Sequence, residues 1–282
     1  MTQDADGVDV TFSDGSTGRY DLVLGADGQW SRTRRLMFGE EAGLGMFHRL
    51  NVHVAYFTVP RHADETDELA RAFQPGGGRA VMSRTGSRPE TQAYLMLRTD
   101  SEEVRKAVER QPAETQKALF EERFRGAGWK ADQFLDAMRD TKDFYADSIG
   151  QVKAPTMVQG RVALLGDAGC CASPVTGMGT TVSLITAYVL AGELARNKGN
   201  VPLALEAYNV NVKPYIDEAQ KLMPGVPQLM TLKSRWAVAL FYAVIRIVSL
   251  LRIDRLVASV TGEDKGGLTV PEYPELKFAP VA

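Results

Sequence analysis

One segment constrains the fold of this chain more than any other: a short apolar strand that runs into a glycine-containing loop and then a helix. Residues 161–165 predict a buried strand, which ends at Gly166-Asp167, and the loop Pro174–Gly179 leads into a helix expected over Thr180–Leu194. Glycines allow close approach of the main chain, and unpaired amides at a helix N-terminus bind anions. An acidic side chain after the strand, here Asp167, can accept hydrogen bonds from ribose or ribityl hydroxyls. This pattern predicts a nucleotide-shaped site, although helix capping and tight packing explain it equally well when it is taken alone.

A second segment near the N-terminus repeats the order of strand, glycine turn and helix. Residues Val8–Phe12 and Tyr20–Leu24 are expected to form a hairpin whose second strand is buried, and Gly25–Gly28 end that strand. Ser31 is placed to cap a short helix over Arg32–Met37. The segment therefore predicts a turn between a buried strand and a helix.

Together the two segments carry a resemblance to a known family. Residues Asp21–Arg34 resemble the second fingerprint, D-x-x-x-GADG-x-x-S-x-x-R, of FAD-dependent aromatic hydroxylases, and Gly166–Gly179 resemble their third, GDAAH-x-x-x-P-x-x-G-x-G. The chain from about Val8 to Tyr215 is similar to the class A flavoprotein monooxygenases of the p-hydroxybenzoate hydroxylase type, which include tetracycline-inactivating enzymes.

The resemblance implies roles for individual residues. Asp167 would bond the ribityl chain of FAD, the amides of Gly177–Thr181 would face the pyrophosphate and the flavin ring, and Pro174 would line the ring pocket. Asp27 and Gly28 would lie near the pyrophosphate and the path of the nicotinamide donor, in a turn fixed by Ser31 and Arg34. The cofactor-binding residues so implied are Asp27, Gly28, Arg34, Gly166, Asp167, Ala168, Pro174, Gly177, Met178, Gly179, Thr180 and Thr181. Without the resemblance, Asp27 is a turn former and Arg34 a solvated helix cation.

Three departures from the family pattern stand out. Cys170 replaces the usual His and Thr181 the usual Asn, so altered flavin reactivity is expected. Nothing before Val8 forms the strand and G-x-G-x-x-G turn with which the family opens, and Gly76–Gly78 reads as a loop. The chain is therefore expected to match the last two-thirds of its relatives, with apolar edges exposed at the strands that end at Leu24 and Leu165.

The function that the resemblance implies is a FAD-binding oxidoreductase. It would be an NAD(P)H-dependent monooxygenase that uses dioxygen to hydroxylate an aromatic or polyketide-like small molecule, in an N-terminally truncated form. No catalytic side chain is assigned, because the cofactor supplies the chemistry. The alternative is a non-catalytic fragment or binding module derived from such an enzyme.

Composition limits the other classes of function. The chain has 33 Lys and Arg against 35 Asp and Glu, so a global positive field that would attract nucleic acid is absent. The two cysteines, Cys170 and Cys171, are adjacent, which excludes a disulfide framework and a cysteine zinc site, and the three histidines lack metal-ligand spacing. Residues Met1–Asp9 do not resemble a signal peptide. We therefore expect no metal site and a reducing, cytoplasmic location.

The middle of the chain predicts a sheet followed by helices. Strands are expected at Leu50–Val59, Arg79–Ser83 and Gln92–Arg98, and helices at Ser101–Glu109, Pro112–Phe124 and Ala131–Met138. The expected fold class is α/β plus α+β: an incomplete doubly wound FAD/NAD(P)-binding layer, an inserted mixed-sheet substrate domain, and C-terminal helices. The expected parts are 1–45 and 151–200 in the FAD-binding domain, 46–150 in the substrate domain, and 201–282 as a helical region.

The C-terminal region predicts two further helices. One begins near Val201-Pro202 and is expected to be kinked or restarted at Pro214. The other, Trp236–Leu251, is nearly all apolar but is interrupted by Arg246 and is shorter than the roughly 20 residues of a membrane span. A buried helix that packs across the domains is favoured. Membrane contact through residues 236–260 is the alternative.

Overall fold

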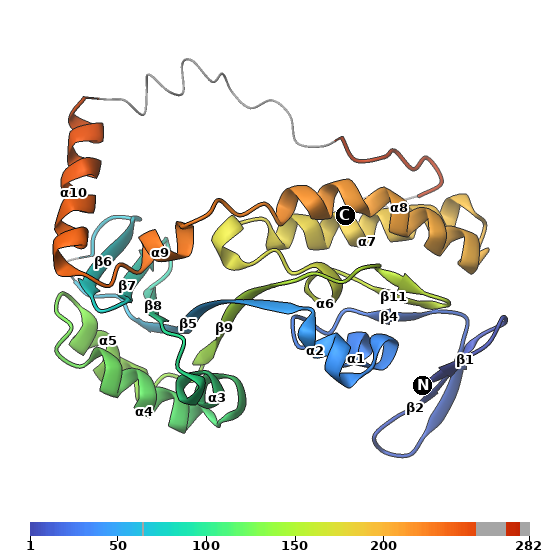
Figure 1. Ribbon diagram of the computed structural model, residues 1–282, viewed down its shortest axis with the longest axis horizontal. Coiled ribbons are helices and arrows are strands. Elements are labelled where there is room, and N and C mark those ends of the chain that lie inside the picture. The colour runs from blue at the N-terminus through green and yellow to red at the C-terminus, as the bar shows by residue number, and fades with distance from the viewer. Residues whose placement is uncertain (64, 252–268, 277–282) are drawn as a thin grey trace. The chain divides into compact units, whose positions relative to one another are not determined.

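The computed structural model describes residues 1–63, 65–251 and 269–276. The chain divides into two compact units, one made of residues 1–48, 150–222 and 265–282, the other of residues 49–149 and 223–264. The chain passes between the units within β5 (Phe47–Pro60) and β9 (Tyr145–Val152). The architecture is mixed α/β, as the expected fold class requires (Figure 1).

The first unit is a small layered α/β structure. Its elements are β1 (Thr2–Gln3), β2 (Val8–Thr11), β3 (Thr17–Tyr20), β4 (Val23–Gly25), α1 (Arg32–Phe38), α2 (Glu40–Gly45), β10 (Val158–Gln159), β11 (Val162–Leu164), α6 (Asp167–Cys170), the 3₁₀ turn η1 (Pro174–Thr176), α7 (Gly179–Arg196) and α8 (Val201–Ala219). Strands β11 and β4 pair in parallel, with β10 antiparallel on the far side of β11. Helices α7 and α8 lie on one side of this sheet and α1 and α2 on the other (Figure 1). Parallel strands with helices on both faces form the doubly wound arrangement. In it, β4 and β11 end next to each other at the same edge of the sheet.

The core of this layer is apolar and includes the buried side chain of Tyr208. Leu164 of β11, Val189 of α7 and Tyr208 of α8 are fully buried in one cluster. The Tyr208 hydroxyl donates to the carbonyl oxygen of Leu164 at 2.7 Å, which satisfies a buried acceptor at the end of the strand. At the edge of the same sheet, Leu24 of β4 is 43% exposed, as expected for this strand.

The N-terminal hairpin differs from the expected one. Strand β2 pairs with β3, with Val8 opposite Tyr20, whereas β4 belongs to the parallel sheet. The prediction that Tyr20–Leu24 is the second hairpin strand was therefore wrong. The turn is tight, with the Phe12 amide bonded to the Ser16 carbonyl, so the partner strand starts at Thr17 and leaves Val23–Gly25 to pair with β11.

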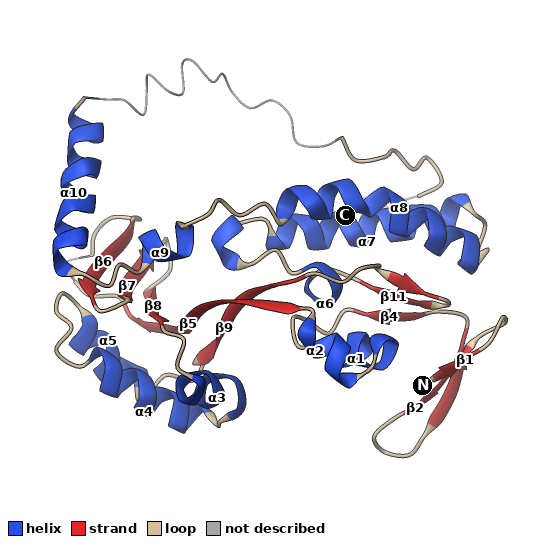
Figure 2. Cartoon of the chain, viewed as in Figure 1, coloured by secondary structure: helices blue, strands red, loops and turns tan. Residues whose placement is uncertain are grey.

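The second unit is an antiparallel sheet with helices on one face. Its elements are β6 (Ala70–Gly76), β7 (Arg79–Thr85), β8 (Glu90–Arg98), α3 (Glu102–Arg110), α4 (Ala113–Phe124), α5 (Ala131–Met138), α9 (Val226–Met230) and α10 (Arg235–Leu250). With β5 and β9 the strand order is β6-β7-β8-β5-β9. Helices α3, α4 and α5 lie together beside this sheet (Figure 2), and their Phe120, Phe134 and Leu135 share a buried cluster with Phe57 and Leu95. The expected strands and helices of the middle region are confirmed. Of the loop expected at Gly76–Gly78, Gly77 and Gly78 form the turn, whereas Gly76 is the last residue of β6.

Two predictions for the C-terminal region differ from the structure. Helix α8 continues through Pro214, so the expected restart of the helix is wrong, while a kink at Pro214 stays a prediction. Helix α10 is not buried: Val238 is its only buried residue among those described, since the helix packs mainly on β6 and most of its apolar surface lies outside that contact. Residues 252–260 lie outside the described part of the chain. None of the described helices has the length and hydropathy needed to cross a membrane.

Candidate functional site

The turn after β11 is shaped by a glycine that no other residue replaces without strain. Gly166 has φ of +51°, and a Cβ added there would lie 2.5 Å from the Ser183 Oγ of α7. The Gly166 amide donates to the Thr186 Oγ1 at 3.2 Å. Helix α7 therefore packs directly on the turn and fixes the position at which Asp167 begins α6.

Asp167 is the first residue of α6, and two buried cysteines, Cys170 and Cys171, follow it at the end of this short helix. The Asp167 side chain is half-buried, whereas Cys170 and Cys171 are almost fully buried. The Cys170 Sγ donates to the Gly166 carbonyl at 3.2 Å. Burial, together with the Asp167 carboxylate, raises the pKa of both thiols to about 12, so they remain protonated and do not act as nucleophiles.

The loop between α6 and α7 is held by its own side chains. The Thr176 Oγ1 donates to the Ser173 carbonyl at 3.1 Å and accepts from the Met178 amide at 3.2 Å. Ser173 has φ of +77°, an unusual value for a non-glycine residue, and its Oγ accepts from the Val175 amide at 3.4 Å. Pro174 is exposed on this ordered loop.

The first turn of α7 presents free donors to open space. Among the described residues, the amides of Gly179, Thr180 and Thr181 have no acceptor, and no side chain caps the helix. Apart from the adjoining residues of the chain and the backbone of α7, nothing lies within 4 Å of a Cβ built at Gly177 or Gly179. Unpaired amides and the dipole of an 18-residue helix favour a negatively charged group at this point.

The turn after β4 is organised around Asp27. Its carboxylate accepts from the Ser31 Oγ at 2.6 Å and from the Thr33 amide at 2.9 Å. Burial opposes ionisation, but the hydrogen bonds from Ser31 and Thr33 outweigh it and hold the pKa of Asp27 below its ordinary value. Next to it, Gly28 has φ of +76° and no protein neighbour within 4 Å of a built Cβ, so this turn also borders open space.

Arg34 joins the two sequence motifs. Its side chain is completely buried, with Nη1 donating to the Ala168 carbonyl at 2.6 Å and Nη2 to the Gln29 carbonyl at 2.7 Å. The Nε donates to the Gly43 carbonyl at 2.9 Å. The interpretation of Arg34 as a solvated helix cation was therefore wrong. The guanidinium is buried, and its hydrogen bonds connect the turn at Gln29 to the turn at Ala168. Ser31 caps α1 as expected, accepting from the Arg34 amide.

The structure thus brings both motifs together in the first unit, and direct contact of their residues with FAD remains a prediction.

Sequence reasoning missed two glutamines that donate hydrogen bonds to the loop between α6 and α7. Gln151 donates to the Ala172 carbonyl at 3.0 Å, and Gln220 donates to the Cys171 carbonyl at 3.2 Å. Neither glutamine lies in a recognisable motif, so the sequence contained no signal for this role.

The second unit has an aromatic surface on the face of its sheet opposite α3–α5. Tyr56 of β5 lies across from Tyr94 of β8, with ring centroids 5.4 Å apart, and stacks on Tyr145 of β9 at 6.1 Å. The Tyr145 hydroxyl donates to the Asp147 Oδ2 at 2.7 Å. Burial, with Tyr94 and Asp147 nearby, raises the pKa of Tyr56 to about 12. A small cavity of about 140 Å³ lies beside Tyr56 and Tyr94.

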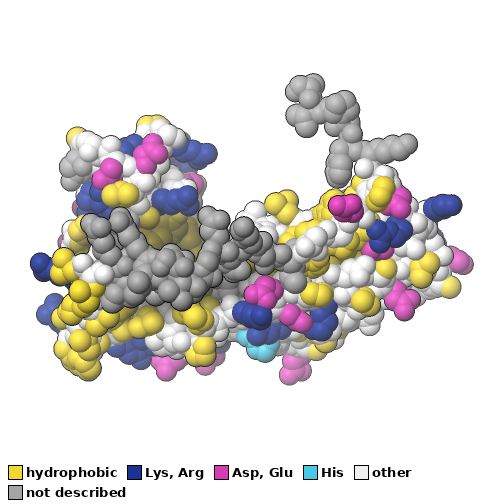
Figure 3. All heavy atoms as spheres, turned by 90° about the horizontal axis from the view of Figure 1, so that it is seen from above, with side chains coloured by type: hydrophobic (Ala, Val, Ile, Leu, Met, Phe, Trp, Pro, Cys, Tyr) yellow, Lys and Arg dark blue, Asp and Glu magenta, His cyan; other side chains and the backbone are white. Residues whose placement is uncertain are grey.

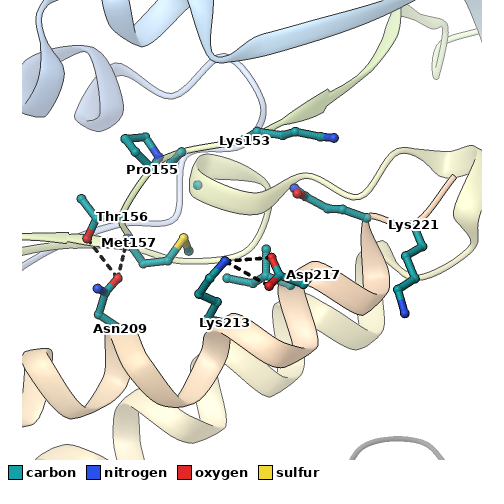
Figure 4. A pocket seen from close by; sticks show the side chains of 12 residues that line it. Lys153, Pro155, Thr156, Met157, Asn209, Lys213, Asp217 and Lys221 are labelled. Atoms are coloured by element: carbon teal, nitrogen blue, oxygen red, sulfur yellow. Dashed lines mark hydrogen bonds and ion pairs between the residues drawn. The ribbon is translucent and has the colours of Figure 1, made fainter.

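A larger cavity, of about 440 Å³, lies in the first unit between α8 and the segment Lys153–Met157 (Figure 4). Its polar groups pair with one another: the Asn209 Oδ1 accepts from the Met157 amide at 2.8 Å, and Lys213 pairs with Asp217 at 3.0 Å. Figure 4 shows Lys153 and Lys221 pointing away from this centre. Because these polar groups already have hydrogen-bond or ion-pair partners within the protein, we assign no ligand to this cavity.

Comparison with known proteins identifies relatives along the whole chain. The family described as "FAD binding domain" matches residues 1–219. The "FAD-dependent monooxygenase asL6" of Sarocladium schorii is 42% identical over 281 residues, which cover 99% of this chain and 66% of the relative. The chain therefore spans slightly less than two thirds of the length of that relative.

Solved structures share the fold. The crystal structure of tetracycline destructase Tet(51) superposes with a TM-score of 0.72 and 28% identity, over 96% of this chain and 67% of that one. Klebsiella pneumoniae HpxO, solved with FAD and uric acid, has a TM-score of 0.64 and 22% identity over 93% of this chain and 65% of that one. At that identity HpxO supports the fold alone.

Proposed function

The chain belongs to the FAD binding domain family, and from this membership we propose that it functions as a FAD-dependent monooxygenase of a small molecule. The name of the Sarocladium schorii relative supports the reaction class. In such a reaction the bound FAD supplies electron transfer from NAD(P)H and the activation of dioxygen. The protein supplies binding, orientation and exclusion of water.

The observation that carries the proposal is the open first turn of α7 beside Asp167. The three unpaired amides of Gly179, Thr180 and Thr181 fit a pyrophosphate or an electron-rich ring edge, and the bare main chain at Gly177 and Gly179 leaves room for a close approach. Asp167, at the end of a parallel strand, fits a ribityl or ribose hydroxyl donor. The residues present therefore suit FAD.

The turn after β4 supports NAD(P)H as the reductant in the proposed reaction. Asp27 and Gly28 border open space at the end of the adjacent strand β4, and we assign them to the path of NAD(P)H and to the FAD pyrophosphate. Because the Ser31 and Thr33 donors hold the Asp27 carboxylate, the direct contacts from this turn would come from main-chain groups around Gly28.

The tyrosine surface of the second unit supports an aromatic or polyketide-like substrate. Tyr56, Tyr94 and Tyr145 provide flat, polarisable faces with hydroxyl groups at their edges, a composition suited to planar molecules that carry oxygen substituents. Asp147 holds the Tyr145 hydroxyl and thereby fixes the orientation of its ring.

The first test is FAD binding by the purified protein, measured by fluorescence titration and by thermal stabilisation. We expect saturable binding that weakens about tenfold or more in Asp167→Ala, because a charge-assisted hydrogen bond is lost. The exposed Asp217→Ala on α8 serves as a matched carboxylate control with unchanged affinity. Absence of any stabilisation by FAD would contradict the proposed cofactor site.

A second test separates the enzyme from the alternative function, a binding module. NAD(P)H oxidation coupled to oxygen uptake and dependent on added FAD supports the monooxygenase. FAD binding without any NAD(P)H oxidation would support the non-catalytic module instead.

A further inference from the structure

Helix α10 carries an apolar stripe that the described residues of its unit leave exposed. At about 100° per residue, Trp236, Leu240 and Ile247 fall on one face of the helix, opposite the single buried residue Val238. Trp236 is 72% exposed, Leu240 56% and Ile247 54%. Figure 3 shows exposed hydrophobic side chains on the left of its view, the side on which Figure 1 draws this helix. The stripe runs the length of the helix.

The base of the helix is fixed to the sheet of the same unit. The Lys233 carbonyl accepts from the Gly77 amide at 2.7 Å, and the Leu232 carbonyl accepts from the Gly78 amide at 3.1 Å. Arg98 of β8 donates to the Thr231 Oγ1 at 3.0 Å. The turn β6–β7 thus holds the start of α10, so the stripe is presented in a defined direction.

The charges that α10 and the segment before it carry, from residue 223 to residue 251, are all of one sign. Lys233, Arg235 and Arg246 are exposed, and the sequence from 223 to 251 contains no Asp or Glu. At 100° per residue, Arg235 and Arg246 lie roughly 60–80° from Val238, at the border between the packed side and the apolar stripe. An apolar face bordered by cations is the pattern of a helix that lies in a lipid–water interface, where the cations meet anionic headgroups.

We propose that α10 attaches this protein peripherally to a membrane surface rich in anionic lipid. The helix is too short to cross the bilayer, so it would lie parallel to the surface with Trp236 and Leu240 at the level of the acyl chains. A second copy of the chain is a poorer occupant of the stripe. Pairing two such helices would bring like charges together, and one pair of 16-residue helices covers less than the roughly 1,200–2,000 Å² of a stable interface.

The experiment is co-sedimentation of the full chain with vesicles of phosphatidylglycerol and phosphatidylcholine, compared with vesicles of phosphatidylcholine alone. We expect binding to the anionic vesicles, with a blue shift of tryptophan emission that is lost in Trp236→Phe. Leu240→Glu should reduce binding at least tenfold, whereas Val210→Glu, at a similarly exposed position on α8, should leave it unchanged. Each of Lys233→Gln and Arg246→Gln should weaken binding roughly fivefold, as expected for one cation near an anionic surface.

The possible results of these experiments distinguish a lipid surface from a second copy of the chain as the partner that covers the stripe. No binding to anionic vesicles at low salt, or equal loss in Leu240→Glu and Val210→Glu, would overturn the proposal. Concentration-dependent dimerisation in sedimentation velocity that Leu240→Glu abolishes would overturn it in favour of a second copy. Because none of these measurements uses FAD, failure here is distinguishable from failure of the proposed function.

Discussion

The guanidinium of Arg34 donates from Nη1 to the carbonyl oxygen of Ala168 at 2.6 Å, although the two residues are 134 positions apart in the chain. This bond fixes the turn that follows β4 to the turn that follows β11. Since all three guanidinium contacts end on main-chain carbonyls, Arg34 is a positioning residue that acts through the turn carrying Asp167.

Arg34→Lys should therefore destabilise the protein while the charge is retained. One ammonium cannot reach three separated carbonyls, and the acceptors it leaves lie in the interior, so the free energy of unfolding should fall by about 3 kcal/mol. Urea denaturation checks this. Arg35→Lys, on the same helix and paired with the exposed Glu40, is the control and should change stability by less than about 0.5 kcal/mol. FAD affinity should fall in the Arg34 variant alone, and equal effects of the two substitutions would contradict the positioning role of Arg34.

A second prediction concerns the close packing of α7 on the turn at Gly166. Gly166→Ala should cost roughly 2–4 kcal/mol in unfolding free energy, because both φ of +51° and the 2.5 Å approach to the Ser183 Oγ disfavour a Cβ. Gly177→Ala, with a similar φ of +69° but open space around it, should cost only the conformational part, about 1 kcal/mol.

The double variant Gly166→Ala with Ser183→Ala separates the two causes. Removing the Oγ should recover part of the loss, and the recovered part measures the contact. No recovery would assign the whole effect to backbone strain.

Sequence patterns identified the parts of this structure whose signal is local. The cap at Ser31, the helix Ala131–Met138, the strand before Gly166 and the helix expected from Thr180 all depend on residues near one another in sequence, and the structure confirms them. The short helix α6 lies in the segment expected to be a loop and was not predicted. Two of the strands that were missed have mixed signals: β6 ends in Pro75-Gly76, and β9 buries Asp147, Ser148 and Gln151.

The remaining features depend on contacts between distant segments. Charged Arg34 is buried only because carbonyls from Gln29, Gly43 and Ala168 converge on it, which no local window reveals. In the same way, the apolar sequence of α10 predicts a buried helix. Only the tertiary structure shows that few of its side chains pack against the rest of the described unit.

A third prediction tests the tyrosine surface. Tyr94→Leu keeps the apolar contact with Tyr56 but removes one aromatic face and its hydroxyl. We expect the KM for a planar aromatic substrate to rise about tenfold, with FAD affinity unchanged, because a ring–ring contact contributes roughly 1 kcal/mol beyond its buried area and the hydroxyl adds a hydrogen bond. Tyr20→Leu on β3, an exposed tyrosine of the first unit, is the control. A change in FAD affinity in Tyr94→Leu would count against a role confined to the substrate.

The last prediction concerns pH and His53 of β5, which is 2% exposed and contacts the Ser148 Oγ through Nδ1 at 2.9 Å. Burial lowers the pKa of His53 below 6.5, although the Glu109 carboxylate opposes the shift. A histidine whose pKa is lower in the folded state takes up a proton more readily when unfolded, so stability is lost as the pH falls below about 6.5. The loss amounts to about 1.4 kcal/mol for each unit of pKa shift once the pH lies below the folded value. Urea midpoints measured at about pH 7.5 and pH 5.5 should therefore differ less in His53→Asn than in the parent protein. His62→Asn, at an exposed histidine, is the control substitution and should keep the parental difference. An unchanged pH dependence in His53→Asn would show that His53 is not the group that destabilises the second unit in this pH range.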